Sequence, residues 1–285
     1  MRGLILPDTN AFLPGLSGNN KKFRTTSKMG LSLKKSLGQH FLRDENISRK
    51  IVDALKERKF SKLLEVGPGA GALTKYLMTW QDIEFKAVEL DQEKIDHILA
   101  SMPLMQGKMI HGDFLRIEKP FSGQFTIVGN FPYNISTQIL FRIIDWRENV
   151  ELMIGMFQKE VAQRAAAREG NKTYGVLSVL VQAFFHVEFL FEVPPSAFMP
   201  PPKVQSAVIR LIPRHSVLPY RSERDFFTLV KMAFNQRRKT LRNAVRPLFA
   251  PEVLSDSVFD KRAEQLSVEY FAQLTHQMNR NNDNK

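Results

Sequence analysis

The sequence predicts an α/β fold with a parallel sheet, followed by a small domain made only of helices. Short apolar runs alternate with amphipathic helical stretches between residues 44 and 129, and a glycine loop directly follows the first run. After Pro213 only helical patterns remain, which places a domain boundary there. We therefore expect a flexible basic arm over residues 1–30, the α/β domain over 31–213 and the helical domain over 214–285.

The predicted elements follow one another as repeated βα units. The first is a helix over 44–59, because Ile47, Ile51 and Leu55 recur at helical spacing behind Asp44, a typical N-cap residue. Strands are predicted over 62–66, 84–90, 109–111 and 125–129, with helices over 73–80 and 91–102. Helices over 137–147 and 160–168 come next, and strands over 184–193 and 206–211 are expected to pair as a hairpin at the sheet edge. The helical domain is predicted to contain helices over 223–232, 238–245 and 268–277.

Composition favours a polyanionic partner. The 285 residues contain 41 Lys and Arg against 29 Asp and Glu, which gives a formal charge of +12. Nucleic acid is the first candidate and an anionic membrane surface the second. No apolar run approaches the roughly 20 residues of a spanning helix, so an integral membrane protein is not expected. The absence of cysteine excludes disulfides and thiolate chemistry and fits the cytoplasm.

The first thirty residues have no packed-domain pattern. They mix Pro, Gly, Asn and Ser with a basic stretch over residues 21–28. The segment is either a flexible arm or an upstream extension with Met29 as the functional start. A solvated tail is the more common explanation of such a basic stretch than RNA contact.

The glycine loop suits a cationic ligand better than a phosphate. Gly67, Gly69 and Gly71 follow a predicted strand, as in sites for dinucleotides and for methyl donors, although some such loops are only tight turns. Pro68 lacks a backbone donor, and Glu65 would repel a pyrophosphate. S-adenosylmethionine carries a sulfonium and an ammonium and no phosphate, so it matches these charges.

Further polar residues fall at the ends of predicted strands. Glu89 lies 22 positions after Gly67, a spacing at which an acid binds paired ribose hydroxyls. Asp113 is placed to accept from the amino group of the donor's adenine, although an acid after a glycine equally caps a turn. Because parallel strands present their carboxyl ends at one edge, we expect these side chains to lie together with Asn130.

The tetrapeptide Asn130-Phe131-Pro132-Tyr133 is predicted to hold a planar amine. The Asn130 side-chain oxygen and the Pro132 carbonyl would accept from the amine, and Tyr133 would stack on the base. A turn with a buried tyrosine is the alternative. Phe198 is a candidate platform for the other face of the base, although a lone phenylalanine is more often core. Two acceptors for an amine beside an aromatic platform suggest methyl transfer to an amino nitrogen.

The helical domain carries a concentration of positive charge. Residues 221–246 contain eight Lys and Arg against two acids, and aromatic residues lie between them. A solvated helix face is the simpler explanation, but the number of charges favours contact with RNA phosphates. We expect Arg237, Arg238, Lys239 and Arg242 to bind RNA. The sequence contains no catalytic triad order and no clustered histidine ligands, so no metal is expected.

Seven ordered stretches resemble the ribosomal RNA adenine dimethyltransferases of the small subunit. The resemblance extends from about Leu33 to the C-terminus. The matching stretches are 37–42, the loop 65–71, 88–91, 129–136, 158–162, 198–204 and 234–240. It implies a Rossmann-like class I S-adenosylmethionine-dependent methyltransferase domain with a helical RNA-binding C-terminal domain. The activity it implies is N6,N6-dimethylation of two adjacent adenosines in the 3′-terminal hairpin loop of small-subunit ribosomal RNA.

The resemblance also implies roles for individual residues. His40 and Leu42 would line the donor pocket, with Gly67 at the methionine part of the donor and Asn130 at the reacting centre. Tyr133 and Phe198 would hold the flipped adenosine between them. The family usually has Leu at position 131, where this chain has Phe, and often Asn at position 40, where it has His.

Several alternatives stay open at this point. One is a large-subunit adenine methyltransferase that confers macrolide resistance; another is an enzyme acting on a protein glutamine amide. A third is a non-catalytic assembly factor for the small subunit. The expected partner is ribosomal RNA within an immature 30S-type subunit, and the expected state is a monomer, because no long heptad seam is present.

Overall fold

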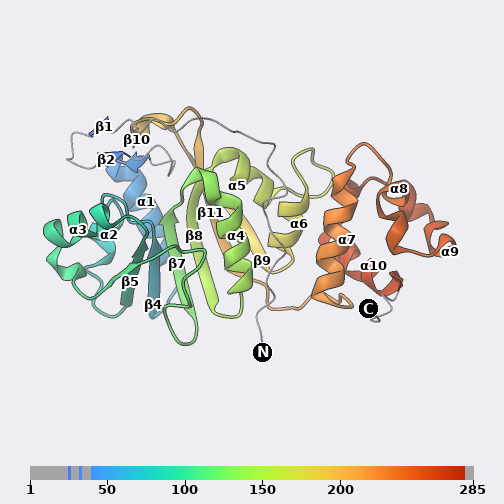
Figure 1. Ribbon diagram of the computed structural model, residues 1–285, viewed down its shortest axis with the longest axis horizontal. Helices are drawn as coiled ribbons and strands as arrows, with labels where there is room; N and C mark the ends of the chain where they lie inside the picture. Colours follow the sequence, from blue (N-terminus) through green and yellow to red (C-terminus); the bar gives the residue numbers. More distant parts are fainter. Residues whose placement is uncertain (1–24, 27–31, 34–39, 280–285) are drawn as a thin grey trace.

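The computed structural model describes residues 25–26, 32–33 and 40–279. Most of the basic arm expected over residues 1–30 therefore lies outside the described residues. The exceptions are Thr25–Thr26 (β1), which pair antiparallel with Ser32–Leu33 (β2). Figure 1 shows an elongated molecule, with α2 and α3 at one end of the long axis and the C-terminal helices at the other.

A seven-stranded sheet forms the centre of the α/β domain, in the order β6-β5-β4-β7-β8-β11-β9. Its strands are β4 (Lys62–Val66), β5 (Glu84–Glu89), β6 (Met109–His111), β7 (Phe125–Asn130), β8 (Val150–Gln158), β9 (Phe185–Val193) and β11 (Ser206–Pro213). Pairing is parallel from β6 through β8, whereas β11 runs antiparallel to both of its neighbours. The predicted parallel sheet and its terminal hairpin are confirmed.

Helices cover both faces of this sheet. They are α1 (Glu45–Lys56), α2 (Thr74–Leu77), α3 (Gln92–Ser101), α4 (Ser136–Asp145), α5 (Lys159–Ala166) and α6 (Val176–Gln182). Successive side chains of a strand point to opposite faces. Leu63 accordingly joins the apolar cluster under α1 and α3, whereas Leu64 and Val66 join the cluster under α4 and α6. Asp44 caps α1 as predicted, and its carboxylate accepts from the backbone N–H of Asn46 at 2.9 Å.

The elements that were not predicted include β8 and α6. The sequence of β8 is an apolar run buried on both faces, with no alternation to mark it as a strand. The predicted helix over 73–80 shortens to the single turn of α2. The helix predicted over 238–245 begins only at Leu241.

A two-stranded ladder lies beyond the carboxyl ends of the central strands. Phe41–Leu42 (β3) pairs antiparallel with Phe198–Met199 (β10). This pairing brings the segment before α1 beside the Pro-rich connection between β9 and β11 (Figure 1). Two distant parts of the chain therefore meet next to the ends of β4 and β7.

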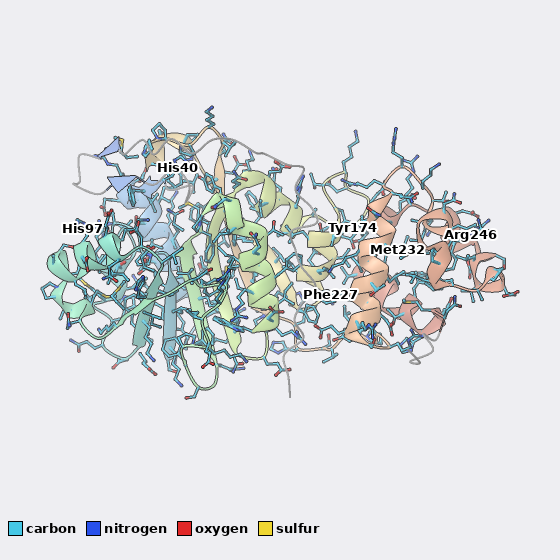
Figure 2. The ribbon with its side chains drawn as sticks, in the orientation of Figure 1. His40, His97, Tyr174, Phe227, Met232 and Arg246 are labelled. Carbon is cyan, nitrogen blue, oxygen red and sulfur yellow. The ribbon has the colours of Figure 1, made fainter. Side chains whose placement is uncertain are left out.

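The C-terminal part is helical, as predicted, and shares its core with the α/β domain. It contains α7 (Glu223–Asn235), α8 (Leu241–Val245), α9 (Pro251–Leu254) and α10 (Val268–Leu274). One buried cluster includes Tyr174 before α6 together with Phe227 and Phe234 of α7. Tyr174 and Phe227 are marked at this junction in Figure 2. Arg147, two residues after α4, also pairs with Glu223 at the start of α7, with 2.7 Å between Nη2 and Oε2. The two parts therefore pack as one body.

Among the described residues, no helix has the length and apolar character that spanning a membrane requires.

Candidate active site

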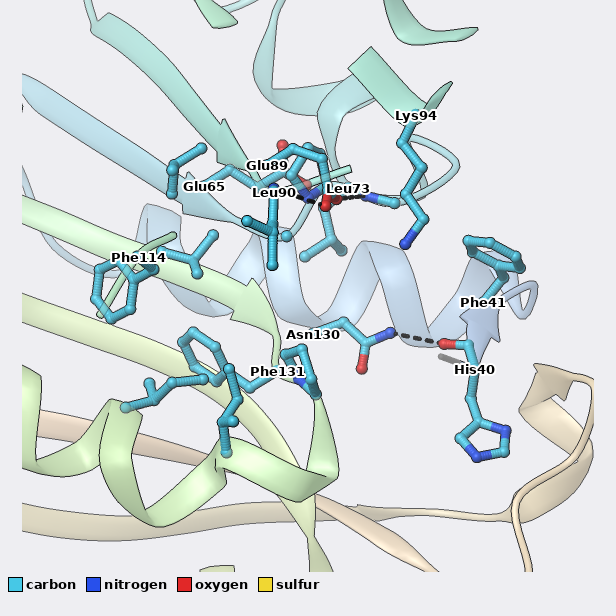
Figure 3. A pocket seen from close by; sticks show the side chains of 18 of the residues that line it. His40, Phe41, Glu65, Leu73, Glu89, Leu90, Lys94, Phe114, Asn130 and Phe131 are labelled. Carbon is cyan, nitrogen blue, oxygen red and sulfur yellow. Dashed lines mark hydrogen bonds between the residues drawn. The ribbon is translucent and has the colours of Figure 1, made fainter. Parts of the chain in front are cut away.

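A cavity of about 210 Å³ opens at the carboxyl ends of β4, β5 and β7. Figure 3 shows side chains from these strand ends facing it, with His40 and Phe41 on the opposite side. The predicted site residues that line it are His40, Leu42, Gly67, Glu89, Asp113, Asn130, Pro132 and Tyr133. The topology of the parallel sheet thus brings together residues that are up to 93 positions apart, the separation of His40 and Tyr133.

The glycine loop needs its glycines for conformation. Gly67 has φ +67° and Gly69 has φ +61°, values at which a side chain would be strained. The Gly69 N–H points toward the Glu89 carboxylate, at 3.4 Å from Oε2. The loop therefore passes directly beside the acid at the end of β5.

Glu89 is held in a fixed orientation. Its Oε1 accepts from the backbone N–H groups of Leu90 at 2.9 Å and Asp91 at 3.0 Å. Among donors of residues 40–279, only Gly69, at a long distance, reaches the other oxygen, Oε2, so this atom keeps capacity to accept. A carboxylate oriented in this way suits a pair of ligand hydroxyls, as predicted for the ribose of the donor.

Glu65 is a buried carboxyl in the wall of the cavity, with only 2% of its surface exposed. Its Oε2 accepts a hydrogen bond from Thr74 Oγ1 at 2.8 Å. Burial raises the pKa of Glu65 from 4.5 to about 8, the Thr74 hydrogen bond lowers it in part, and the charge of Glu89 raises it further. A cationic ligand group nearby would favour the ionised form, so the residue fits the ammonium of the predicted donor.

Asn130 presents an acceptor to the cavity. Its Nδ2 donates to the His40 carbonyl at 3.2 Å, drawn as a dashed line in Figure 3. This bond fixes the orientation of the side-chain amide and leaves Oδ1 available to accept from a substrate amine.

The second predicted acceptor, the Pro132 carbonyl, is already engaged. It accepts from the N–H of Ile135 at 3.3 Å and lies 3.2 Å from Ser136 Oγ, a hydroxyl that it shares with the Tyr133 carbonyl at 3.1 Å. No donor within residues 40–279 bonds to the carbonyl of Phe131, the preceding residue. The geometry therefore favours the Phe131 carbonyl as the second acceptor for the amine, beside Asn130 Oδ1. The Pro132 carbonyl is instead bonded within the 3₁₀ turn at Tyr133–Ile135 (η4).

Tyr133 contacts two other parts of the chain. Its hydroxyl is 2.5 Å from Ser206 Oγ at the start of β11, and its ring stacks on His40 with 5.4 Å between centroids. Burial raises the pKa of Tyr133, and the Ser206 hydrogen bond offsets part of this shift. His40 Nδ1 in turn lies 2.9 Å from the Pro200 carbonyl. One face of the Tyr133 ring is thus covered by the imidazole.

Asp113 caps a turn and also lines the cavity. Its Oδ1 accepts from the N–H of Leu115 at 2.9 Å, and its Oδ2 lies 3.6 Å from Arg116 Nε. Both functions considered for this acid in the sequence are therefore compatible with its position.

Phe198 does not line the cavity. The ring is buried, with 3% of the residue exposed, and belongs to the apolar cluster under α1. Its strand, β10, pairs with the Leu42 strand that does line the cavity. A platform role for Phe198 would require the ring to leave this cluster.

The four predicted RNA-binding residues divide into two kinds. Arg238 and Lys239 are exposed in the turn between α7 and α8. Arg237 donates instead to the carbonyls of Lys172 and Tyr174, and Arg242 pairs with Asp260 at 2.9 Å.

Phe41 and Lys94 are among the cavity residues that the sequence prediction missed. Phe41 belongs to β3, and the Lys94 ammonium lies 5.4 Å from the centre of its ring. Lys94 is three residues after the N-cap Asp91 of α3, and no local pattern marks it as facing inward.

The polar side chains of the cavity fit S-adenosylmethionine. Two acids at neighbouring strand ends match a ligand with a cation and paired hydroxyls. Within the described part of the chain, no group of three His, Cys, Asp or Glu side chains could hold a metal ion.

Comparisons with known proteins agree with this geometry. Residues 30–279 match the family described as ribosomal RNA adenine dimethylase. A relative from Cytophaga hutchinsonii, named ribosomal RNA small subunit methyltransferase A, is 49% identical over 249 residues, which are 86% of this chain and 96% of the relative. A relative of the same name from Flavobacterium johnsoniae is 46% identical, over 86% of this chain and 95% of the relative.

Solved structures show the same architecture. A dimethyladenosine transferase from Plasmodium falciparum is 27% identical, with a TM-score of 0.72 over 82% of this chain and 96% of that one. The 23S rRNA methyltransferase ErmE is 23% identical, with a TM-score of 0.63 over 83% of this chain and 100% of that one. At that identity, the likeness to ErmE shows the fold alone.

Proposed function

The chain belongs to the ribosomal RNA adenine dimethylase family, and from this premise we propose that it dimethylates N6 of two adjacent adenosines in the 3′-terminal hairpin loop of small-subunit ribosomal RNA. It is an S-adenosylmethionine-dependent rRNA adenine methyltransferase with a Rossmann-like class I domain. The names of the relatives from Cytophaga hutchinsonii and Flavobacterium johnsoniae support the small subunit as the source of the substrate.

One observation carries the proposal: a single cavity joins the glycine loop and Glu89 to Asn130. When bound, the donor supplies a methyl group made electrophilic by the sulfonium. Glu89 Oε2 would accept from the donor's ribose hydroxyls, and ionised Glu65 would offset the positive charge of its ammonium. Asp113 would accept from its adenine amino group.

The chemistry depends on orientation of the target amine. The lone pair of adenine N6 is delocalised into the ring, so the amine is a weak nucleophile until its geometry is fixed. Asn130 Oδ1 and the Phe131 carbonyl would accept from N6 and direct the lone pair toward the methyl carbon. The amine becomes acidic as it is alkylated and its proton leaves to solvent, so no strong base is required.

Entry of the base requires His40 to move. Its ring stacks on Tyr133, its Nδ1 lies 2.9 Å from the Pro200 carbonyl, and its own carbonyl accepts from Asn130 Nδ2. We propose that a flipped adenosine takes the place of the imidazole on the Tyr133 ring, because both are planar and both stack on an aromatic face. Phe198 would serve as a second platform for the base only if substrate binding exposed its ring.

The partner is proposed to be an immature small ribosomal subunit, and the enzyme is proposed to act as a monomer in the cytoplasm. Only the likeness in fold to ErmE supports action on large-subunit RNA. A non-catalytic assembly factor is disfavoured because Gly67, Glu89 and Asn130 lie together at the cavity.

Nucleoside mass spectrometry tests this function directly. Unmethylated small subunits, and large subunits beside them, are incubated with the protein and S-adenosylmethionine, with Asn130→Ala as the matched variant. Dimethyladenosine confined to small-subunit RNA is expected with the wild type. Product on large-subunit RNA, or binding of small subunits without product, would overturn the proposal.

A further inference from the structure

The Phe131 ring lies against two glycines that leave it no spare room. Its Cε2 is 2.3 Å from the position that a Cβ on Gly155 would occupy, and its Cε1 is 2.9 Å from the corresponding position on Gly129. Both distances are too short for two carbons that are not bonded to each other. Neither glycine has a positive φ. Space, and not backbone conformation, therefore requires a glycine at each position.

The two glycines lie side by side in the sheet. Gly129 of β7 and Gly155 of β8 are partners in the parallel pairing of these strands. Partners in neighbouring strands direct their side chains to the same face, so two glycines in register leave a gap in the side-chain layer there. We name this gap the glycine slot. The Phe131 ring fills it and is buried, and the Phe157 ring lies beside it, with 4.8 Å between centroids.

The ring in the glycine slot belongs to the residue whose carbonyl is proposed to accept from the target amine. The Phe131 N–H donates to the Met156 carbonyl at 3.1 Å, which ties this backbone to β8. On the other side, Pro132 restricts the backbone conformation of Phe131. Figure 3 shows Phe131 beside Asn130, with its ring turned away from His40. The seating of the ring and the direction of the carbonyl are therefore coupled.

A methyl group at position 155 would displace the ring. Its distance to Phe131 Cε2 would have to open from 2.3 Å to the 3.4 Å at which ordinary contact begins, a shift of about 1 Å. Phe157 Cε2 at 2.8 Å and Met153 Sδ at 2.9 Å also approach this position, but both are ends of side chains that can move where the ring yields. A misplacement of about 1 Å in an orienting group can lower a rate on the order of 100-fold.

We propose that Gly155 is a positioning residue for methyl transfer: through the Phe131 ring it sets where the Phe131 carbonyl meets the target amine, and a phenylalanine at position 131 requires a glycine at position 155. The proposal rests on the proposed function, which gives that carbonyl its role. Gly155 is not among the residues that line the cavity, so its role is indirect. The glycine slot also explains how this chain accommodates Phe where the family usually has Leu.

The test uses a cycle of substitutions. The variants are Gly155→Ala, Phe131→Leu and the two combined. Tritiated methyl transfer to small subunits gives kcat and KM, calorimetry gives the affinity for S-adenosylmethionine, and thermal unfolding gives Tm. The control is Gly107→Ala in the turn before β6. Gly107 has φ +76° and no other atom within 4 Å of an added Cβ, so this change strains the backbone without touching the cavity.

The expected result is a loss of turnover that the second substitution reverses. Gly155→Ala should lower kcat on the order of 100-fold, with donor affinity unchanged, because it disturbs only the orientation of the amine. A leucine side chain has no atoms in place of the ε carbons of the ring. The double variant should therefore turn over within about twofold of Phe131→Leu alone. Gly107→Ala should lower Tm and leave kcat unchanged, which separates positioning from stability.

Two results would overturn the proposal: wild-type kcat in Gly155→Ala, or a double variant as slow as Gly155→Ala. If Gly155→Ala does not fold, the double variant decides: folding with the kcat of Phe131→Leu supports the glycine slot, and any other result overturns it. The wild type serves as the reference for the proposed function. If it forms dimethyladenosine on small-subunit RNA while the cycle fails, only the role of Gly155 is wrong. If it forms none, the proposed function fails, and this proposal with it.

Discussion

Replacing Glu65 by Gln should make the unliganded protein more stable at neutral and alkaline pH. The unfolded carboxyl titrates near 4.5, whereas burial raises the pKa of Glu65 in the fold to about 8. Between these values the folded state retains a proton that the unfolded state has lost, so stability falls as pH rises. This loss of stability is absent below about pH 4.5 and complete above about pH 8.

The shift sets the size of the effect. The pKa shift lowers the free energy of unfolding of the wild type by roughly 3 kcal/mol at pH 7, by roughly 5 kcal/mol above pH 8 and by less than about 1 kcal/mol at pH 5. Gln keeps the shape of the side chain and an oxygen that can accept from Thr74, but it does not ionise. At about 2 °C per kcal/mol for a chain of this size, Tm should rise by about 6 °C at pH 7.

The assay is thermal unfolding, followed by circular dichroism, of the wild type and Glu65→Gln from pH 5 to pH 9. The difference in Tm should grow with pH and level off above pH 8. A difference that stays constant across this range would refute the reasoning. Because the charge of Glu89 raises the pKa of Glu65, Glu89→Gln should lower that pKa, so the Tm difference that Glu65→Gln makes in this background should be smaller and level off at a lower pH.

The same carboxyl should make donor binding dependent on pH. An ammonium beside Glu65 favours the ionised form, so binding of S-adenosylmethionine at pH 7 should release a proton. Calorimetry in two buffers with different heats of ionisation measures this release. It should disappear in Glu65→Gln, and equal release from both proteins would contradict the assignment.

Three further substitutions test the site. Asn130→Ala should lower kcat on small subunits by about 100-fold or more through loss of amine orientation, measured by tritiated methyl transfer; near-normal turnover would exclude the proposed clamp. Glu89→Ala should weaken donor binding by about 10-fold or more in calorimetry, since it removes charge-assisted bonds to hydroxyls, and unchanged affinity would place the ribose elsewhere. Phe198→Ala should destabilise the fold by about 3–5 kcal/mol in urea unfolding, because the ring is buried, and an unchanged midpoint would mean that it is not core.

The sequence predicted those cavity residues that lie at the ends of strands. Gly67, Glu89 and Asn130 were identifiable because each follows a strand, and the carboxyl ends of parallel strands meet at one edge. The β8 strand was missed because a strand buried on both faces has no alternating pattern.

Local sequence patterns could not predict the contacts between distant segments. The sequence predicted Arg237 as an RNA contact from its charged neighbours, but its hydrogen bonds go to residues more than sixty positions earlier. The Pro132 carbonyl was chosen for its rigid ring, and only the turn that follows it reveals that this carbonyl accepts from the N–H of Ile135. His40 was assigned to the donor pocket, and its stacking on Tyr133 depends on a pairing between β3 and β10 that no spacing indicates.

The shared core of the two domains has a consequence for successive methylation. Tyr174, Phe227 and Phe234 belong to one buried cluster, and Arg147 pairs with Glu223 across the junction, so the helical domain is packed firmly against the α/β domain. We therefore expect the distance from the helical domain to Asn130 to stay the same through the catalytic cycle. For the second adenosine to reach the place of the first, the RNA loop must change its own conformation while its stem stays in place.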